Sequence, residues 1–151
     1  MLRISRAAAT ACVVALAVGA CGSGSTYKGL PKSEFVKQTN ATCKSYNAQF
    51  TTLFGHVSAK PTLAEVKSIY KDQAIPLFRK EVISLRVLNP PPEDRAAVKK
   101  IFDDLSTGVD QLDAAVSGAK SLKELESLSP SGLARASAAA KAYGLTDCGG
   151  S

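Results

Sequence analysis

Four cysteines are the residues of this 151-residue chain best suited to covalent chemistry. Cys21 is the most informative of them, because a branched apolar residue and two small residues, Val18-Gly19-Ala20, come directly before it. A thiol supplies the nucleophile for a thioether, and small residues let the chain lie extended in a protease groove. The pattern therefore makes Cys21 the candidate for a covalent modification.

The segment before Cys21 has the features of an export signal. Arg3 and Arg6 are basic, and an apolar stretch follows over 7–18. As a helix this stretch would rise about 18 Å, which is short of the roughly 30 Å hydrocarbon core of a bilayer. The segment is therefore predicted to be a secretory signal and not a transmembrane span.

Residues 18–21 resemble the lipobox of bacterial lipoproteins. The resemblance implies cleavage before Cys21, so that residues 1–20 are a signal peptide. It also implies a diacylglycerol, with acyl chains such as palmitate, on the Cys21 sulfur and a protein anchored on the extracytoplasmic side of the cell membrane. Each buried methylene adds about 0.8 kcal/mol, so two or more chains anchor stably. The Gly- and Ser-rich residues 21–30 are predicted to be a flexible tether. The alternative is a soluble secreted protein with a chance cysteine at its cleavage site.

The other cysteines predict one disulfide. Cys12 leaves with the signal peptide and Cys21 carries lipid, which leaves Cys43 and Cys148 in the exported domain. Two thiols in an oxidising compartment favour a structural bridge between them. A zinc site needs more ligands than these two cysteines and the lone His56 provide. No metal and no cofactor are therefore expected.

Apolar residues after residue 30 recur every three or four positions, which is the spacing of helices that bury one face. The first helix is expected from Pro31 to about Gly55, with Cys43 on its buried stripe. Thr62 and Glu65 form a capping box that should begin the second helix.

Proline and glycine divide the rest of the chain. Pro76 lies within the second helix and is expected to kink it, because its ring clashes with the carbonyl four residues earlier. The third helix should follow the break at 89–92 and end at Gly118. A short helix over 121–128 precedes an Ala-rich last helix, which Gly144 should end in a left-handed conformation.

Four main helices with short connections predict an all-α fold, an antiparallel four-helix bundle over 31–151. The residues after the last helix should fold back, so that Cys148 reaches Cys43 on the first helix. The bridge would then join the two helices that are farthest apart in the sequence.

Three motifs span most of the chain after Cys21, namely Glu34-Phe35 with Ala41-Thr42-Cys43, then Leu88-Asn89-Pro90-Pro91-Pro92, and last Ala142-Tyr143-Gly144-Leu145 with Cys148-Gly149. In these motifs the sequence resembles a group of short, uncharacterised actinobacterial lipoproteins. The resemblance implies the location, the helical fold and the disulfide. No established activity comes with it.

Five aromatic residues lie along the first two predicted helices: Tyr46, Phe50, Phe54, Tyr70 and Phe78. They could line a cavity for a small apolar ligand. They could equally be core residues that compensate for the small side chains of the last helix. Both interpretations stay open at the level of the sequence.

The sequence contains little evidence for a catalytic site. His56 is the lone histidine and has no partner nearby in the sequence, so no nucleophile and base are evident. The acidic residues of the third helix have ordinary helical spacing, which is typical of a solvated face: Asp103, Asp104, Asp110 and Asp113. The protein is therefore not expected to be an enzyme.

Besides an enzyme whose chemistry the sequence does not show, two non-catalytic functions remain. The first is a lipid-anchored, non-catalytic helical interaction module that binds another protein of the cell envelope. The alternative is a carrier or sensor that holds a lipid or small apolar ligand within the bundle. The chain has a net charge of +6, but its lysines are neither clustered nor interleaved with aromatic residues, so nucleic acid is not an expected partner.

Overall fold

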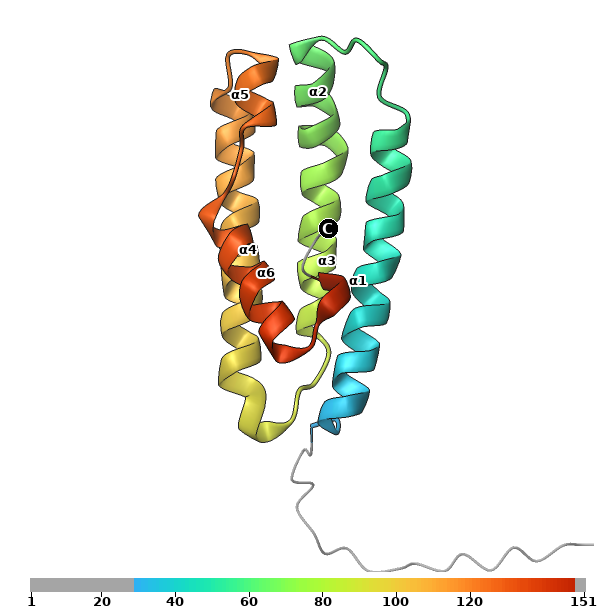
Figure 1. Ribbon diagram of the computed structural model, residues 1–151, viewed down its shortest axis with the longest axis vertical. Helices are drawn as coiled ribbons and strands as arrows, with labels where there is room; N and C mark the ends of the chain where they lie inside the picture. The colour runs from blue at the N-terminus through green and yellow to red at the C-terminus, as the bar shows by residue number, and fades with distance from the viewer. Residues whose placement is uncertain (1–28, 149–151) are drawn as a thin grey trace, which may run out of the picture.

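The computed structural model describes residues 29–148, which are helical with no strand among them (Figure 1). The elements in chain order are α1 (Lys32–Gly55), α2 (Leu63–Ile69), the π-helix η1 (Tyr70–Ala74), α3 (Ile75–Arg86), the 3-10 helix η2 (Pro92–Asp94), α4 (Arg95–Gly118), α5 (Leu122–Glu126), α6 (Ser131–Tyr143) and the 3-10 helix η3 (Thr146–Cys148).

The long helices run antiparallel, which confirms the predicted four-helix bundle. In Figure 1, α1 leads away from the N-terminal end of the bundle, the continuous rod α2-η1-α3 returns, and α4 leads away again. The last helix, α6, is shorter and crosses obliquely over α4. Within residues 29–148 no helix is both long and apolar enough to cross a membrane. The predicted signal peptide, Cys21 and most of the predicted tether lie outside the described residues.

Local hydrogen bonds set the helix ends where the sequence predicts them. The Thr62 hydroxyl accepts from the Glu65 N–H at 3.2 Å, and the Glu65 carboxylate accepts from the Thr62 N–H at 2.6 Å. This pair is the predicted capping box. Gly144 ends α6 with a φ of 104°, the left-handed conformation that glycine adopts without strain.

The effect of Pro76 is a change of helix type rather than a simple interruption. Directly before it, η1 widens the helix to a π-turn, and the Ile75 N–H donates to the Tyr70 carbonyl five residues back. Proline has no N–H and crowds the preceding turn, and a π-turn is one way to accommodate it. The helix then continues as α3, with proline in its first turn.

The core consists of two apolar clusters along the bundle axis. One lies toward the N-terminal end of α1 and includes Phe35, Leu85 and Phe102. The other lies toward α5 and includes Ile75 and Leu112. Side chains at the junction of the two clusters are less completely buried. The candidate site lies at this junction.

Helices α4 and α6 approach each other through two glycines, Gly108 and Gly132. A Cβ atom at residue 132 would lie 2.4 Å from the Gly108 nitrogen and 2.8 Å from the Asp104 carbonyl oxygen. Both obstacles are backbone atoms, which cannot rotate away as a side chain can. The contact therefore requires glycine for space.

Gly132→Ala should lower the free energy of unfolding by about 1–3 kcal/mol, because α6 must separate from α4 to admit the methyl group. The matched control is Gly118→Ala at the end of α4, where an added Cβ meets nothing within 4 Å. That control should be neutral or slightly stabilising, because alanine favours helix by up to about 1 kcal/mol. Urea unfolding of both variants measures the difference, and equal changes would contradict the tight contact.

Candidate functional site

A cleft of about 310 Å³ opens in the side of the bundle, where α1, α3, α4 and α6 meet the C-terminal η3. Its lining is mostly apolar and comes from all five elements: Asn47, Phe50, Phe54, Phe78, Glu81, Leu105, Leu133, Ser137 and Cys148. Pockets for small molecules are commonly of this kind, concave and apolar with few polar groups. We therefore take this cleft as the candidate site.

The cleft lies between the two core clusters. Phe78 and Leu133 pack against the cluster near α5, whereas Leu105 and Cys148 pack against the other. The buried residues of α6 are small, namely Gly132, Ala136 and Ala140. Because these side chains are small, they fill little space beside the cleft.

Three of the five aromatic residues singled out in the sequence line this cleft: Phe50, Phe54 and Phe78. The ring centroids of Phe50 and Phe78 are 4.1 Å apart. Tyr70 lies outside the lining, with its ring 5.4 Å from that of Phe54. Tyr46 also lies outside it and shares a 2.8 Å hydrogen bond with the Ser84 hydroxyl. All five side chains are half-buried.

Glu81 is the charged residue of the site, and the sequence did not single it out. It is only 7% exposed and lines the cleft on α3, but it makes no hydrogen bond or ion pair with any residue in the range 29–148. Burial raises the pKa of its carboxyl to about 7, because an apolar environment disfavours the charged form. Near neutral pH this group is therefore divided between its acid and its carboxylate.

One signal in the sequence marks Glu81. It stands three residues after Phe78 and four before Leu85, so it shares the inward side of α3 with two apolar residues. A charged residue at such a position departs from the apolar pattern expected of a buried helix face. The sequence thus contains the anomaly, although it does not show that the carboxyl lacks a partner.

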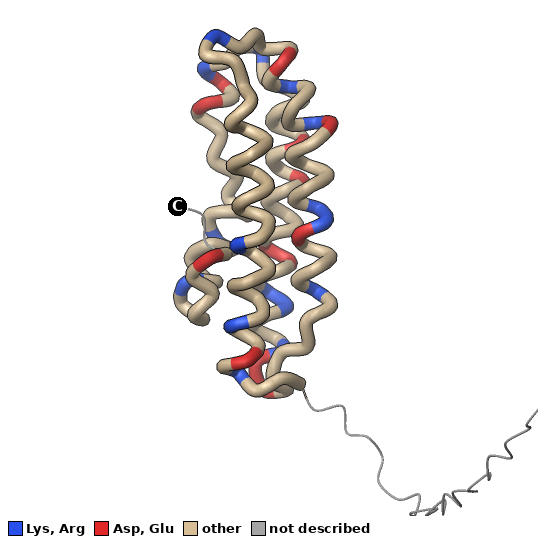
Figure 2. Tube along the Cα trace, turned by 90° about the vertical axis from the view of Figure 1, so that its right-hand side faces the viewer, with Lys and Arg blue, Asp and Glu red and all other residues tan. Residues whose placement is uncertain are grey.

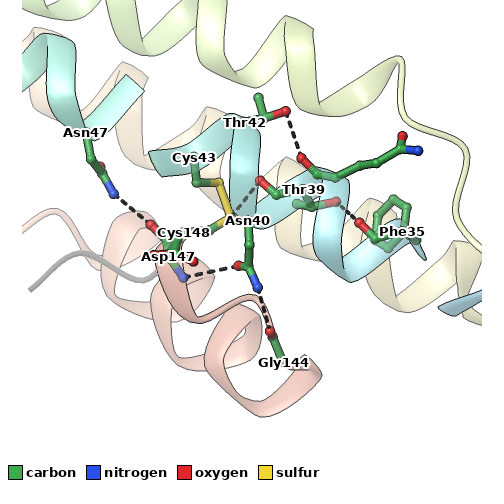
Figure 3. The surroundings of a disulfide bond; sticks show 10 residues. Phe35, Thr39, Asn40, Thr42, Cys43, Asn47, Gly144, Asp147 and Cys148 are labelled. Carbon is green, nitrogen blue, oxygen red and sulfur yellow. Dashed lines mark hydrogen bonds between the residues drawn. A yellow bond between two sulfur atoms is a disulfide. The ribbon is translucent and has the colours of Figure 1, made fainter. Parts of the chain in front are cut away.

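The predicted disulfide is present at the C-terminal wall of the cleft and is confirmed. Cys43 on α1 and Cys148 on η3 are bonded, with Cα atoms 5.1 Å apart (Figure 3). Asn47 donates from its side chain to the Asp147 carbonyl at 2.7 Å, and the Asp147 N–H donates to the Asn40 side chain at 3.1 Å. The bridge and the two asparagines together attach η3 to α1.

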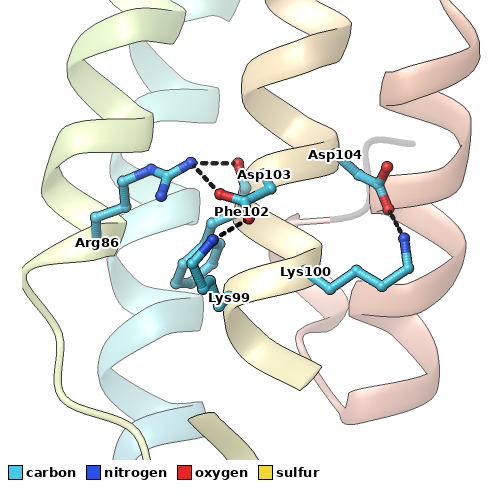
Figure 4. Close-up of polar contacts among 6 residues, drawn as sticks. All are labelled: Arg86, Lys99, Lys100, Phe102, Asp103 and Asp104. Atoms are coloured by element: carbon cyan, nitrogen blue, oxygen red, sulfur yellow. Dashed lines mark hydrogen bonds and ion pairs between the residues drawn. The ribbon is translucent and has the colours of Figure 1, made fainter. Parts of the chain in front are cut away.

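The acidic residues of α4 are engaged in surface ion pairs. Asp103 accepts from Arg86 at 2.7 Å and also pairs with Lys99, while Asp104 pairs with Lys100 (Figure 4). Hydrogen bonds from Lys99 and Arg86 lower the pKa of Asp103. The remaining two, Asp110 and Asp113, both pair with Arg79 of α3.

The other hollows found on the described surface are more open to solvent than the cleft. Basic and acidic residues alternate along the bundle (Figure 2), and residues 29–148 contain no group of three side chains suited to holding a metal ion. His56 is exposed at the end of α1. Larger hollows of about 410 and 520 Å³, beside Arg79 and His56, are more open to solvent than the cleft.

No known protein family, no curated protein and no solved structure matches the chain. Function is therefore inferred from the geometry of the cleft and from the motifs of the sequence.

Proposed function

We propose that this protein is an exported, lipid-anchored carrier or sensor that binds a small apolar ligand in the cleft beside α1 and α6. The observation that carries the proposal is the cleft itself, because three phenylalanines from two helices face a shared space of about 310 Å³. A well-packed bundle would have closed over such side chains. The function is binding, and no catalytic step is part of it.

The location rests on the lipobox motif at Cys21 and on the disulfide, which suits an oxidising compartment. Leu30 is nine positions after Cys21, a span of at most about 32 Å. The N-terminal end of α1 would therefore lie near the membrane. Phe50 stands eighteen residues after Lys32, which places the cleft about 27 Å farther along the bundle.

Native mass spectrometry of the protein, gently extracted from its own membrane, tests the proposal. We expect a chain that begins at Cys21, carries acyl mass and lacks two hydrogens because of the disulfide. We also expect an additional bound mass that is released on denaturation. A chain that never carries such a mass would contradict the carrier or sensor function.

Cys21→Ala is the matched control for the anchor. This variant should remain an uncleaved or soluble precursor, because the thioether cannot form without the thiol. Unchanged membrane fractionation of Cys21→Ala would contradict lipid anchoring. The proposal that the cleft binds a ligand would not be affected by that result.

A non-catalytic interaction module is the second candidate function. It is favoured by two exposed apolar residues, Ile83 on α3 and Val87 directly after its end, which are 63% and 75% exposed. Such residues are typical of contact surfaces when they stand together. Under this function the protein binds another protein of the cell envelope. Crosslinking from α3 in the intact envelope would capture that partner protein.

A further inference from the structure

We propose that the ligand of the cleft is a small organic cation, an apolar body that carries one ammonium group, and that Glu81 is its counter-ion. This inference rests on the proposed function and adds the chemical class of the ligand. It follows from an acidic side chain that is almost fully buried, lines an apolar cleft and has no cationic partner among the described residues.

The position of Glu81 is the first step. An ionised carboxylate in an apolar wall costs free energy unless a cation or hydrogen-bond donors offset the loss of water. Neither is supplied by residues 29–148, although arginines and lysines pair with the acidic residues of α4 nearby. A ligand cation in the cleft would supply the missing charge.

Among residues 29–148, Glu81 is the only charged residue that lines the cleft. Its walls from α1, α4 and α6 contribute phenylalanine, leucine, asparagine and serine side chains, and the Cys148 sulfur is in the disulfide. Arg79 and Lys80 precede Glu81 on α3 but are exposed, and Arg79 pairs with acidic residues of α4. Asp147, next to Cys148, is exposed as well. The charge preference of the cleft therefore depends on Glu81.

The aromatic walls favour the same class of ligand. Phe50, Phe54 and Phe78 present apolar surface to the body of a ligand, and an aromatic ring face also attracts a cation. A volume of about 310 Å³ is at the lower limit for pockets that hold small molecules. A compact aromatic or alkyl amine fits these features better than a long lipid chain.

Titration calorimetry with three probes of similar size and different charge tests the inference: phenethylamine, phenethyl alcohol and phenylacetate. The full chain is used in lipid nanodiscs, and the heat from protein-free nanodiscs is subtracted. At about pH 8 the amine should bind at least about tenfold more tightly than the alcohol, because charge-assisted hydrogen bonds are the stronger ones. This preference should decrease toward about pH 5.5, where Glu81 is protonated.

Glu81→Gln keeps the shape of the side chain and removes its charge, so it should bind the amine and the alcohol equally well. Glu126→Gln, which changes an exposed carboxylate on α5, should retain the preference of the unaltered protein. Equal affinity of the unaltered protein for amine and alcohol would overturn the inference, as would tightest binding of phenylacetate. Both results would leave the apolar binding function in place, whereas failure of all three probes to bind would overturn that function too.

Discussion

Loss of the Cys43–Cys148 bridge should lower the free energy of unfolding by about 2–5 kcal/mol, whichever cysteine is replaced by serine. The two residues are 105 apart in the sequence, and a loop of that length restricts the unfolded chain by about 4.7 kcal/mol in the chain-entropy model. Urea unfolding of the single variants and of the double variant measures the loss. Reduction of the unaltered protein should produce the same loss.

The double variant makes the test specific. If the bridge carries the effect, the double variant should lose no more stability than either single variant, because each change removes the same bond. Asn47→Ala is the matched control, since it removes a 2.7 Å hydrogen bond at the same junction and should cost only about 1 kcal/mol. Additive losses, or free thiols in the oxidised protein, would contradict the bridge.

Most of the fold could be predicted because its determinants are local. The Thr62 capping box, the Gly144 cap and the helical spacing of apolar residues each act within a few residues, and each is found as predicted. The disulfide could be predicted because the proposed cleavage and lipidation at Cys21 would leave only Cys43 and Cys148 to pair. The π-helix before Pro76 could not, since proline disturbs a helix in several ways and the surrounding packing selects one of them.

The site could be predicted only in part, because a cleft depends on how far helices are apart. The close contact of Gly108 with Gly132 holds α6 on α4, and the small buried residues of α6 leave room beside α1. Neither effect is periodic in the sequence. The same spacing of Phe50, Phe54 and Phe78 would serve a filled core or an open cleft. Whether Glu81 has a partner depends on how four different helices are placed around it.

Glu81 should make the protein less stable as the pH rises through the window from about 4.5 to about 7. Burial raises the pKa of this carboxyl from 4.5 to about 7, so within this window the folded state binds a proton that the unfolded state has lost. Stability therefore decreases with increasing pH, by about 3 kcal/mol across the window. Urea unfolding at a series of pH values measures the slope.

Glu81→Gln should remove most of this slope, because the amide stays neutral at every pH. The variant should exceed the unaltered protein in stability by up to about 3 kcal/mol near pH 8 and match it near pH 4.5. Hydrogen bonds with Lys99 and Lys100 lower the pKa of Asp103 and Asp104, so both stay charged across the window and add no slope. The exposed control Glu126→Gln should keep the slope. If Glu81→Gln also keeps the pH slope, burial does not hold the Glu81 carboxyl neutral. The carboxylate would then be accommodated without a bound cation.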